Sequence, residues 1–284
     1  MAPFWVKKAP PVVETINPEP LGIPYAEVFT DPIVLVVTIA MTAIFLVLRK
    51  LFGHPKSMFA SNPPIAAHAF TFMLPFVYLA IRGLNIWYFD DSLHRIDRRF
   101  GDHSGGRHLI AVMIGTQIFD IPSSILIGGP LAAPNFVVHH VVVLSLAILA
   151  LRYRFAFYYG VYFMGVTELS TPLLAFVDLF RDFPKFALKF PNTNETVRIS
   201  FAIAFFWVRI ISWLPISVKF WSDAFGMLAD TLPRNALPKG VLYLWLVVHT
   251  FLTILQHWGI KIAKAAYLMA IGDKSAREIE AKGA

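Results

Sequence analysis

The sequence predicts an all-α polytopic membrane protein, built as a single bundle of about seven transmembrane helices. Of its 284 residues, 57% are hydrophobic and only 15% are charged, against about 25% charged residues in an ordinary soluble domain. The mean hydropathy is +0.61. Several apolar stretches approach or exceed the roughly 20 residues that a helix needs to cross a bilayer.

Three parts follow one another along the chain. Residues 1–30 carry six prolines, which favour an extended arm without helix, lying on a membrane surface or on a partner. Residues 31–271 form the helical bundle, in which we find no internal repeat. Residues 272–284 form a short charged tail.

The apolar stretches place the individual spans. We predict seven of them, at residues 32–51, 65–88, 108–126, 134–151, 155–180, 199–220 and 240–269. Residues 89–107 form the longest strongly charged connection, and Gly128-Gly129-Pro130 predicts a sharp turn. Pro75 is expected to kink the second span and Pro172 the fifth.

Charge and composition exclude several classes of protein. The net charge is +7, but the basic residues lie in loops and helix flanks, where anionic lipid headgroups explain them better than nucleic acid does. The absence of cysteine excludes disulfides and thiolate metal sites. The histidines do not form the repeated clusters of a di-iron enzyme, so we expect no metal. Lys and Arg are balanced between the two sides, which leaves the orientation open.

Polar side chains inside the predicted spans are costly in hydrocarbon, so each marks a candidate site or an interhelical contact. Gln117, Asp120 and Ser124 fall on one helix face. The adjacent histidines 139 and 140 point about 100° apart, so one of them would face the interior. Arg209 needs an acidic partner, for which Asp120, Glu168 and Asp178 are the candidates. The full set is Gln117, Asp120, His139, His140, Glu168, Thr171, Arg209, His249 and Gln256.

Two interpretations of this set stay open. In the first, the side chains converge on one interior cavity wide enough for a hydrocarbon chain. In the second, they form separate interhelical hydrogen bonds that pin the bundle, each contributing about 0.6 kcal/mol.

Six short motifs, taken in order, resemble the TLC domain, which translocating-chain-associated membrane proteins and ceramide synthases share. The resemblance covers about residues 35–270 and is strongest to the small TLC-domain-containing proteins, with ceramide synthases as more distant relatives. The motifs are DRRFG (97–101), Asp120 after Gly115, the pair His139-His140, TELSTPLL (167–174), FFWVRI (205–210) and LQHW (255–258).

The resemblance implies a function in handling acyl lipids, in sphingolipid or phospholipid acyl metabolism. In ceramide synthases the paired histidines belong to an acyl-transfer site that is reached by acyl-CoA, so an active protein would be a lipid N-acyltransferase with acyl-CoA as co-substrate and no other cofactor. Imidazole suits such work as a general base or acyl carrier. By this resemblance His139 and His140 take the catalytic places. From the polar set inside the spans, Glu168 and Asp120 join them as candidate catalytic residues, and the candidate lipid-binding residues are Gln117, Thr171, Arg209, His249 and Gln256.

A second class of function stays open beside this one. The chain would then be a non-catalytic accessory subunit of a larger membrane complex, held through its proline-rich arm. Membrane lipids are the expected partners in both cases, with other protein subunits added in the second. The resemblance favours the endoplasmic reticulum, with an organelle inner membrane as the alternative.

Overall fold

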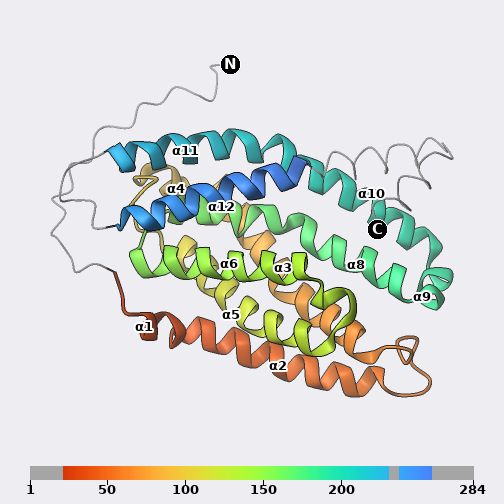
Figure 1. The fold of residues 1–284 in the computed structure, drawn as a ribbon. Helices are drawn as coiled ribbons and strands as arrows, with labels where there is room; N and C mark the ends of the chain where they lie inside the picture. Colours follow the sequence, from red (N-terminus) through yellow and green to blue (C-terminus); the bar gives the residue numbers. More distant parts are fainter. Residues whose placement is uncertain (1–21, 230–236, 258–284) are drawn as a thin grey trace.

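The computed structural model describes residues 22–229 and 237–257 (Figure 1). All regular structure within these residues is helical, which confirms the predicted class. Six helical segments are long and apolar enough to cross a membrane. A further apolar helix, α12 (Lys239–His257), begins where the seventh span was predicted, and the predicted end of that span, residue 269, lies outside the described residues.

Successive long helices run antiparallel, so the chain passes back and forth along the bundle (Figure 1). The first four spans match the predicted ones to within a few residues. Helix α5 lies at the centre, since 61% of its apolar window is buried against 17% for α2. These spans are α2 (Pro32–Phe52), α3 (Pro63–Phe89), α5 (Ser104–Ile127) and α6 (Pro134–Tyr153).

Proline marks the start of several of these helices, because the first turn leaves its backbone N–H groups unpaired and proline has none to lose. The side chain of Asp31 caps α2 by accepting from the backbone N–H of Ile33 (2.8 Å). The predicted turn after α5 is the short 3₁₀ helix η1 (Gly129–Ala132), entered by Gly128 and Gly129 at φ of 79° and 62°.

Two connections contain more helix than predicted. Residues of the proline-rich arm form α1 (Tyr25–Phe29), so this part of the arm is not extended. The charged connection contains α4 (Asp91–Arg95), and α5 starts four residues before residue 108 because the ring of His103 accepts the N–H of Gly106. Residues 1–21 of the arm and the tail 272–284 lie outside the described residues.

The fifth span was predicted as one helix, and this was wrong: it is broken into α7 (Phe157–Phe163), the 3₁₀ turn η2 (Val166–Ser170) and α8 (Thr171–Asp182). The break lies where the backbone of Gly165 crosses that of Gly83 on α3. A Cβ at Gly83 would come within 2.5 Å of the carbonyl carbon of Gly165. Pro172 occupies the first turn of α8 and so begins a helix after the break.

The sixth span is much longer than the predicted residues 199–220. After α9 (Pro184–Lys189), a 39-residue segment runs from Pro191 to Ala229. It consists of α10 (Pro191–Phe205), the π-helical turn η3 (Phe206–Ile211) and α11 (Trp213–Ala229). The hydroxyl of Tyr162 donates to the carbonyl of Val208 inside η3 (2.8 Å). Such π turns frequently occur at functional sites.

The contact between Gly83 and Gly165 leads to a prediction about stability. Gly83→Ala should lower the free energy of unfolding by about 1–3 kcal/mol, because the new methyl group meets backbone atoms that have no room to move. Thermal unfolding of the purified protein in a mild detergent measures the effect. The control is Gly226→Ala in α11, where nothing lies within 4 Å of the new Cβ and alanine favours helix by up to about 1 kcal/mol. Equal melting temperatures for the two variants would contradict the account.

Candidate functional site

The carboxylate of Asp120 lies at the meeting point of three helices. It is fully buried, with 0% of the residue exposed. Nε2 of His68, on α3, lies 2.8 Å from its Oδ1, and Nδ1 of His140, on α6, lies 2.8 Å from its Oδ2. Two imidazoles from neighbouring helices therefore share one buried carboxylate on α5.

Neighbours on the same face of α5 complete this group. One turn before Asp120, Oε1 of Gln117 lies 2.8 Å from Nδ1 of His140. The N–H direction of His140 favours Gln117, so Oδ2 of Asp120 acts on the ring by charge and has no hydrogen-bond partner among the described residues. One turn after, the hydroxyl of Ser124 donates to Oδ1 of Asp120 (3.3 Å). The predicted helix face is therefore a polar face in the structure.

One ring nitrogen of His140 remains available. Its Nδ1 faces Gln117 and Asp120, whereas Nε2 has no hydrogen-bond partner among the residues that the structure describes. The ring packs against Phe136, with 4.1 Å between the ring centroids. A carboxylate that fixes one nitrogen and stabilises the protonated ring leaves the other nitrogen able to accept a proton.

Glu168, Ser170, Thr171 and Arg209 form a second polar group. Arg209 of the π turn donates from Nε to Ser170 Oγ (3.0 Å) and from Nη2 to Thr171 Oγ1 (3.2 Å). The same Nη2 lies 3.5 Å from Glu168 Oε2, which also accepts from the hydroxyl of Thr171 (2.5 Å). Among the three predicted acidic partners, Arg209 therefore pairs with Glu168. The guanidinium joins η3 to both η2 and α8.

His139 lies apart from the buried network. It is exposed on α6, and its ring centroid is 5.4 Å from that of His140. Of the two adjacent histidines, His140 faces the interior.

The family model of the TLC domain matches residues 33–264 of the sequence, and this range includes both polar groups. The chain belongs to the TLC-domain family. It is therefore an integral, multi-pass membrane protein of a lipid-handling family. No curated protein and no solved structure matches the chain.

The structure does not bring every predicted residue of this TLC domain together. His249, on α12, bonds through Nε2 to Ser217 Oγ (2.9 Å), and its ring stacks on Trp213 at 5.3 Å and 8°. Its contacts among the described residues are with α7 and α11, none with Asp120 or Arg209, so it acts in packing. The side chain of Gln256 lies outside the described residues.

Reasoning from the sequence missed His68. It lies close to the predicted start of the second span, where a histidine is common near the headgroups, yet the structure buries it to 3% exposure. The signal was present, since an imidazole within an apolar span requires a partner wherever the span begins. Within residues 22–229 and 237–257, no group of three or more His, Cys, Asp or Glu is placed to hold a metal ion.

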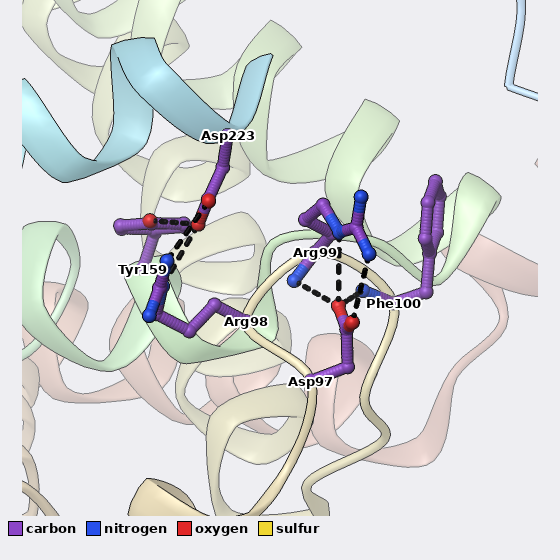
Figure 2. Close-up of polar contacts among 6 residues, drawn as sticks. All are labelled: Asp97, Arg98, Arg99, Phe100, Tyr159 and Asp223. Carbon is purple, nitrogen blue, oxygen red and sulfur yellow. Dashed lines mark hydrogen bonds and ion pairs between the residues drawn. The ribbon is translucent and has the colours of Figure 1, made fainter. Parts of the chain in front are cut away.

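The DRRFG motif, in the loop between α4 and α5, makes a separate set of polar contacts, here called the clasp (Figure 2). Its members are Asp97, Arg98, Arg99, Phe100, Tyr159 and Asp223. Arg98 reaches Asp223 on α11 through two hydrogen bonds, Nε to Oδ2 (2.8 Å) and Nη2 to Oδ1 (2.9 Å), and Tyr159 on α7 donates to the same carboxylate. These bonds and the charge of Asp223 raise the pKa of Arg98. Beside it, the carboxylate of Asp97 accepts the backbone N–H groups of Arg99 (2.7 Å) and Phe100 (3.1 Å). The motif thus ties the loop to two spans.

The shared carboxylate of Asp120 generates a prediction. Asp120→Asn keeps the volume but turns an amide N–H toward one of the two imidazoles, so we expect a loss of about 1.5–3 kcal/mol in the free energy of unfolding. Unfolding in mild detergent, followed by circular dichroism, measures it. Asp91→Asn is the control, because that carboxylate is 89% exposed and 3.6 Å from Arg95, and exposed pairs contribute little. Unchanged stability in Asp120→Asn would show that the buried contacts are not formed.

The clasp generates a prediction about pH. Burial alone would raise the pKa of Asp97. Hydrogen bonds from the side chain of Arg99 and from two backbone N–H groups outweigh this effect and bring the pKa below its ordinary value of 3.8. The charged form therefore stabilises the fold above pH 3.8, and this contribution is lost as the pH falls through the lower folded-state pKa. Asp97→Asn should lower the melting temperature at neutral pH.

The difference in melting temperature between Asp97→Asn and the unaltered protein should then shrink as the pH falls below about 3.8. A melting series between pH 7 and pH 3 measures it. Asp102→Asn serves as control, since the 62%-exposed Asp102 carboxylate forms one ion pair with Arg107 (2.9 Å). A difference for Asp97→Asn that stays constant over the series would contradict the assigned hydrogen bonds.

Proposed function

We propose that this TLC-domain protein binds an acyl lipid inside the bundle, with the polar head of the lipid at His140. One observation carries the proposal: Nε2 of His140 has no partner among the described residues, while Nδ1 is fixed beside a fully buried carboxylate. A polar nitrogen in an apolar bundle costs free energy unless a ligand or water satisfies it. A hydroxyl, amine or amide of a lipid head would supply the missing bond.

The second polar group supports an acidic or carbonyl head group. Arg209 has 18% of its side chain exposed, so a ligand can reach its guanidinium. Glu168, Thr171 and Ser170 hold its guanidinium on one side. In the proposal, Gln117 and Asp120 orient His140, and Arg209 with Thr171 and His139 contacts the lipid oxygens.

If the site turns over, the reaction that fits is transfer of a fatty acyl group from acyl-CoA to the amine of a lipid acceptor. Nε2 of His140 would take a proton from the acceptor amine while the amine nitrogen attacks the thioester carbonyl. The C–N bond forms, the C–S bond breaks, and the proton passes to the departing thiolate. Asp120 stabilises the imidazolium between these steps.

A second function, that of an accessory subunit, is favoured by how the arm meets the bundle. The backbone N–H of Ile23 donates to the carbonyl of Arg152 (2.9 Å), and Nη1 of Arg152 donates to the carbonyl of Ile23 (3.1 Å). The guanidinium also lies 3.8 Å from the ring centroid of Tyr25. Residues 23–25 are therefore held at the end of α6, and a fixed position there suits attachment of the arm to a neighbouring subunit. The family favours the endoplasmic reticulum for the first function, and an organelle inner membrane is the alternative for the second.

The lipid proposal predicts the behaviour of His140→Gln. The variant should retain about a tenth or less of the acyl lipid that co-purifies with the unaltered protein, because each bond to a buried polar partner contributes about 1–3 kcal/mol. Mass spectrometry of lipids extracted from the protein in mild detergent measures the loss. Acyl transfer from acyl-CoA to a sphingoid amine, assayed in the same membranes, should fall with it if the protein is an enzyme.

The matched control is His108→Gln, on the same helix as Asp120 but more than three turns away. His108 bonds only to the hydroxyl of Tyr78 (2.7 Å) among the described residues, so its loss should leave bound lipid unchanged. Equal lipid content in both variants and the unaltered protein would overturn the lipid proposal. The accessory function would then be favoured by a stable complex in mild detergent that is lost on deleting residues 1–21.

A further inference from the structure

A pocket of about 710 Å³ lies where α2 ends and the chain turns toward α3. No part of the two polar groups or of the clasp lines it. Its lining residues are Val47, Lys50, Leu51, His54, Lys56 and Ser57.

One wall of the pocket is both apolar and basic. Val47, Lys50, Leu51 and His54 are spaced three, four and seven residues apart, so they follow one helical face and its continuation into the loop. Val47 is 58% exposed and Leu51 is 60% exposed. Both belong to a membrane-spanning helix, so this exposure faces the hydrocarbon, whereas the lysines lie at its end, at the level of the headgroups.

The surrounding hairpin has only positive charge. Between Asp31 and Asp90 the sequence contains no Asp or Glu, while it contains two lysines and two arginines. Neither Lys50 nor Lys56 forms an ion pair within the part of the chain that the structure describes. An anion in the pocket would therefore meet no carboxylate from either helix of this hairpin.

The loop that holds Lys56 is fixed in place. Phe59 is 7% exposed and packs in an aromatic cluster, 4.9 Å from Phe52 and 5.0 Å from Phe183 between ring centroids. The hydroxyl oxygen of Ser57 accepts the backbone N–H of Phe59 (3.2 Å), which leaves its O–H free to donate. The N–H groups of Gly53 and His54 bond to the carbonyls of Arg49 and Leu51, so the turn after α2 is also held by backbone hydrogen bonds.

We propose that this pocket binds an anionic phospholipid. The phosphate lies between the ammonium groups of Lys50 and Lys56, with the hydroxyl of Ser57 as a further donor, and an acyl chain runs along Val47 and Leu51. Basic pockets beside membrane helices suit such headgroups. A zwitterionic phospholipid offers the same chains without the net negative charge, and inorganic phosphate offers the charge without the chains.

The test titrates the purified, delipidated full-length protein in mild detergent with phosphatidylglycerol and follows the melting temperature. We expect a saturable rise that neither phosphatidylcholine with the same chains nor inorganic phosphate reproduces. Lys50→Gln/Lys56→Gln should weaken the apparent affinity about 25-fold, since each lysine near an anionic headgroup contributes about fivefold. The same loss of about 25-fold should appear when the two lysine substitutions are made in the His140→Gln background, which separates this site from the proposed function.

The matched control is Lys185→Gln/Lys189→Gln on α9, which removes two exposed lysines from the same end of the bundle (Figure 1). Its affinity should stay within twofold of that of the unaltered protein. An equal loss in both double variants would show non-specific attraction and overturn the proposal. Equal binding of phosphatidylcholine would also overturn the proposal, because the site would then accept any phospholipid. Competition by inorganic phosphate alone would overturn it as well, because the site would then bind a free anion.

Discussion

The bundle depends on compensating one buried negative charge. Asp120 lies on α5, the most buried span, and has no exposed atom. A carboxylate in such surroundings is tolerated only where donors meet it, and removing a partner of a buried pair typically costs about 3–5 kcal/mol. Because His68 and His140 come from the two helices on either side, this requirement fixes the positions of α3 and α6 against α5 along their length. Hydrophobic packing alone would allow these apolar surfaces to slide, since lipid tails are as apolar as the helices.

The 3₁₀ turn η2 and the π turn η3 depend on the position of α3 against α5. Once α3 is fixed, its Gly83 admits the backbone of Gly165, and the fifth span cannot continue as a regular helix past that contact. The turn η2 places Glu168 and Ser170 facing η3, where the π turn directs Arg209 toward them. Tyr162 from α7 supports the same π turn through the carbonyl of Val208. The clasp made by Arg98, Asp223 and Tyr159 holds the far end of the same pair of segments (Figure 2).

What could be predicted from the sequence follows from what each signal depends on. Span positions depend on local hydropathy, and α2 and α6 were predicted to within a few residues. The Arg209–Glu168 pair was among the expected ones, since a buried guanidinium needs a carboxylate. The break at Gly165 was not predicted because its cause is Gly83, more than 80 residues earlier, and the π turn was not predicted because it depends on a tertiary bond from Tyr162. His68 was missed although an imidazole inside an apolar span requires a partner; the identity of that partner depends on where α3 lies in the bundle.

The charges of the two polar groups bear on what His140 can do. Asp120 and Glu168 are two carboxylates, and Arg209 is the one cation that the described residues place against them. A carboxylate in a low-dielectric interior requires compensating donors or charge. Nε2 of His68 and the hydroxyl of Ser124 both lie against Oδ1 of Asp120, at 2.8 Å and 3.3 Å. His140 is held from its Nδ1 side by Gln117 and by Oδ2 of Asp120. One buried carboxylate thus joins α3, α5 and α6 through two imidazoles, and within the described part of the chain it leaves Nε2 of His140 without a hydrogen-bond partner.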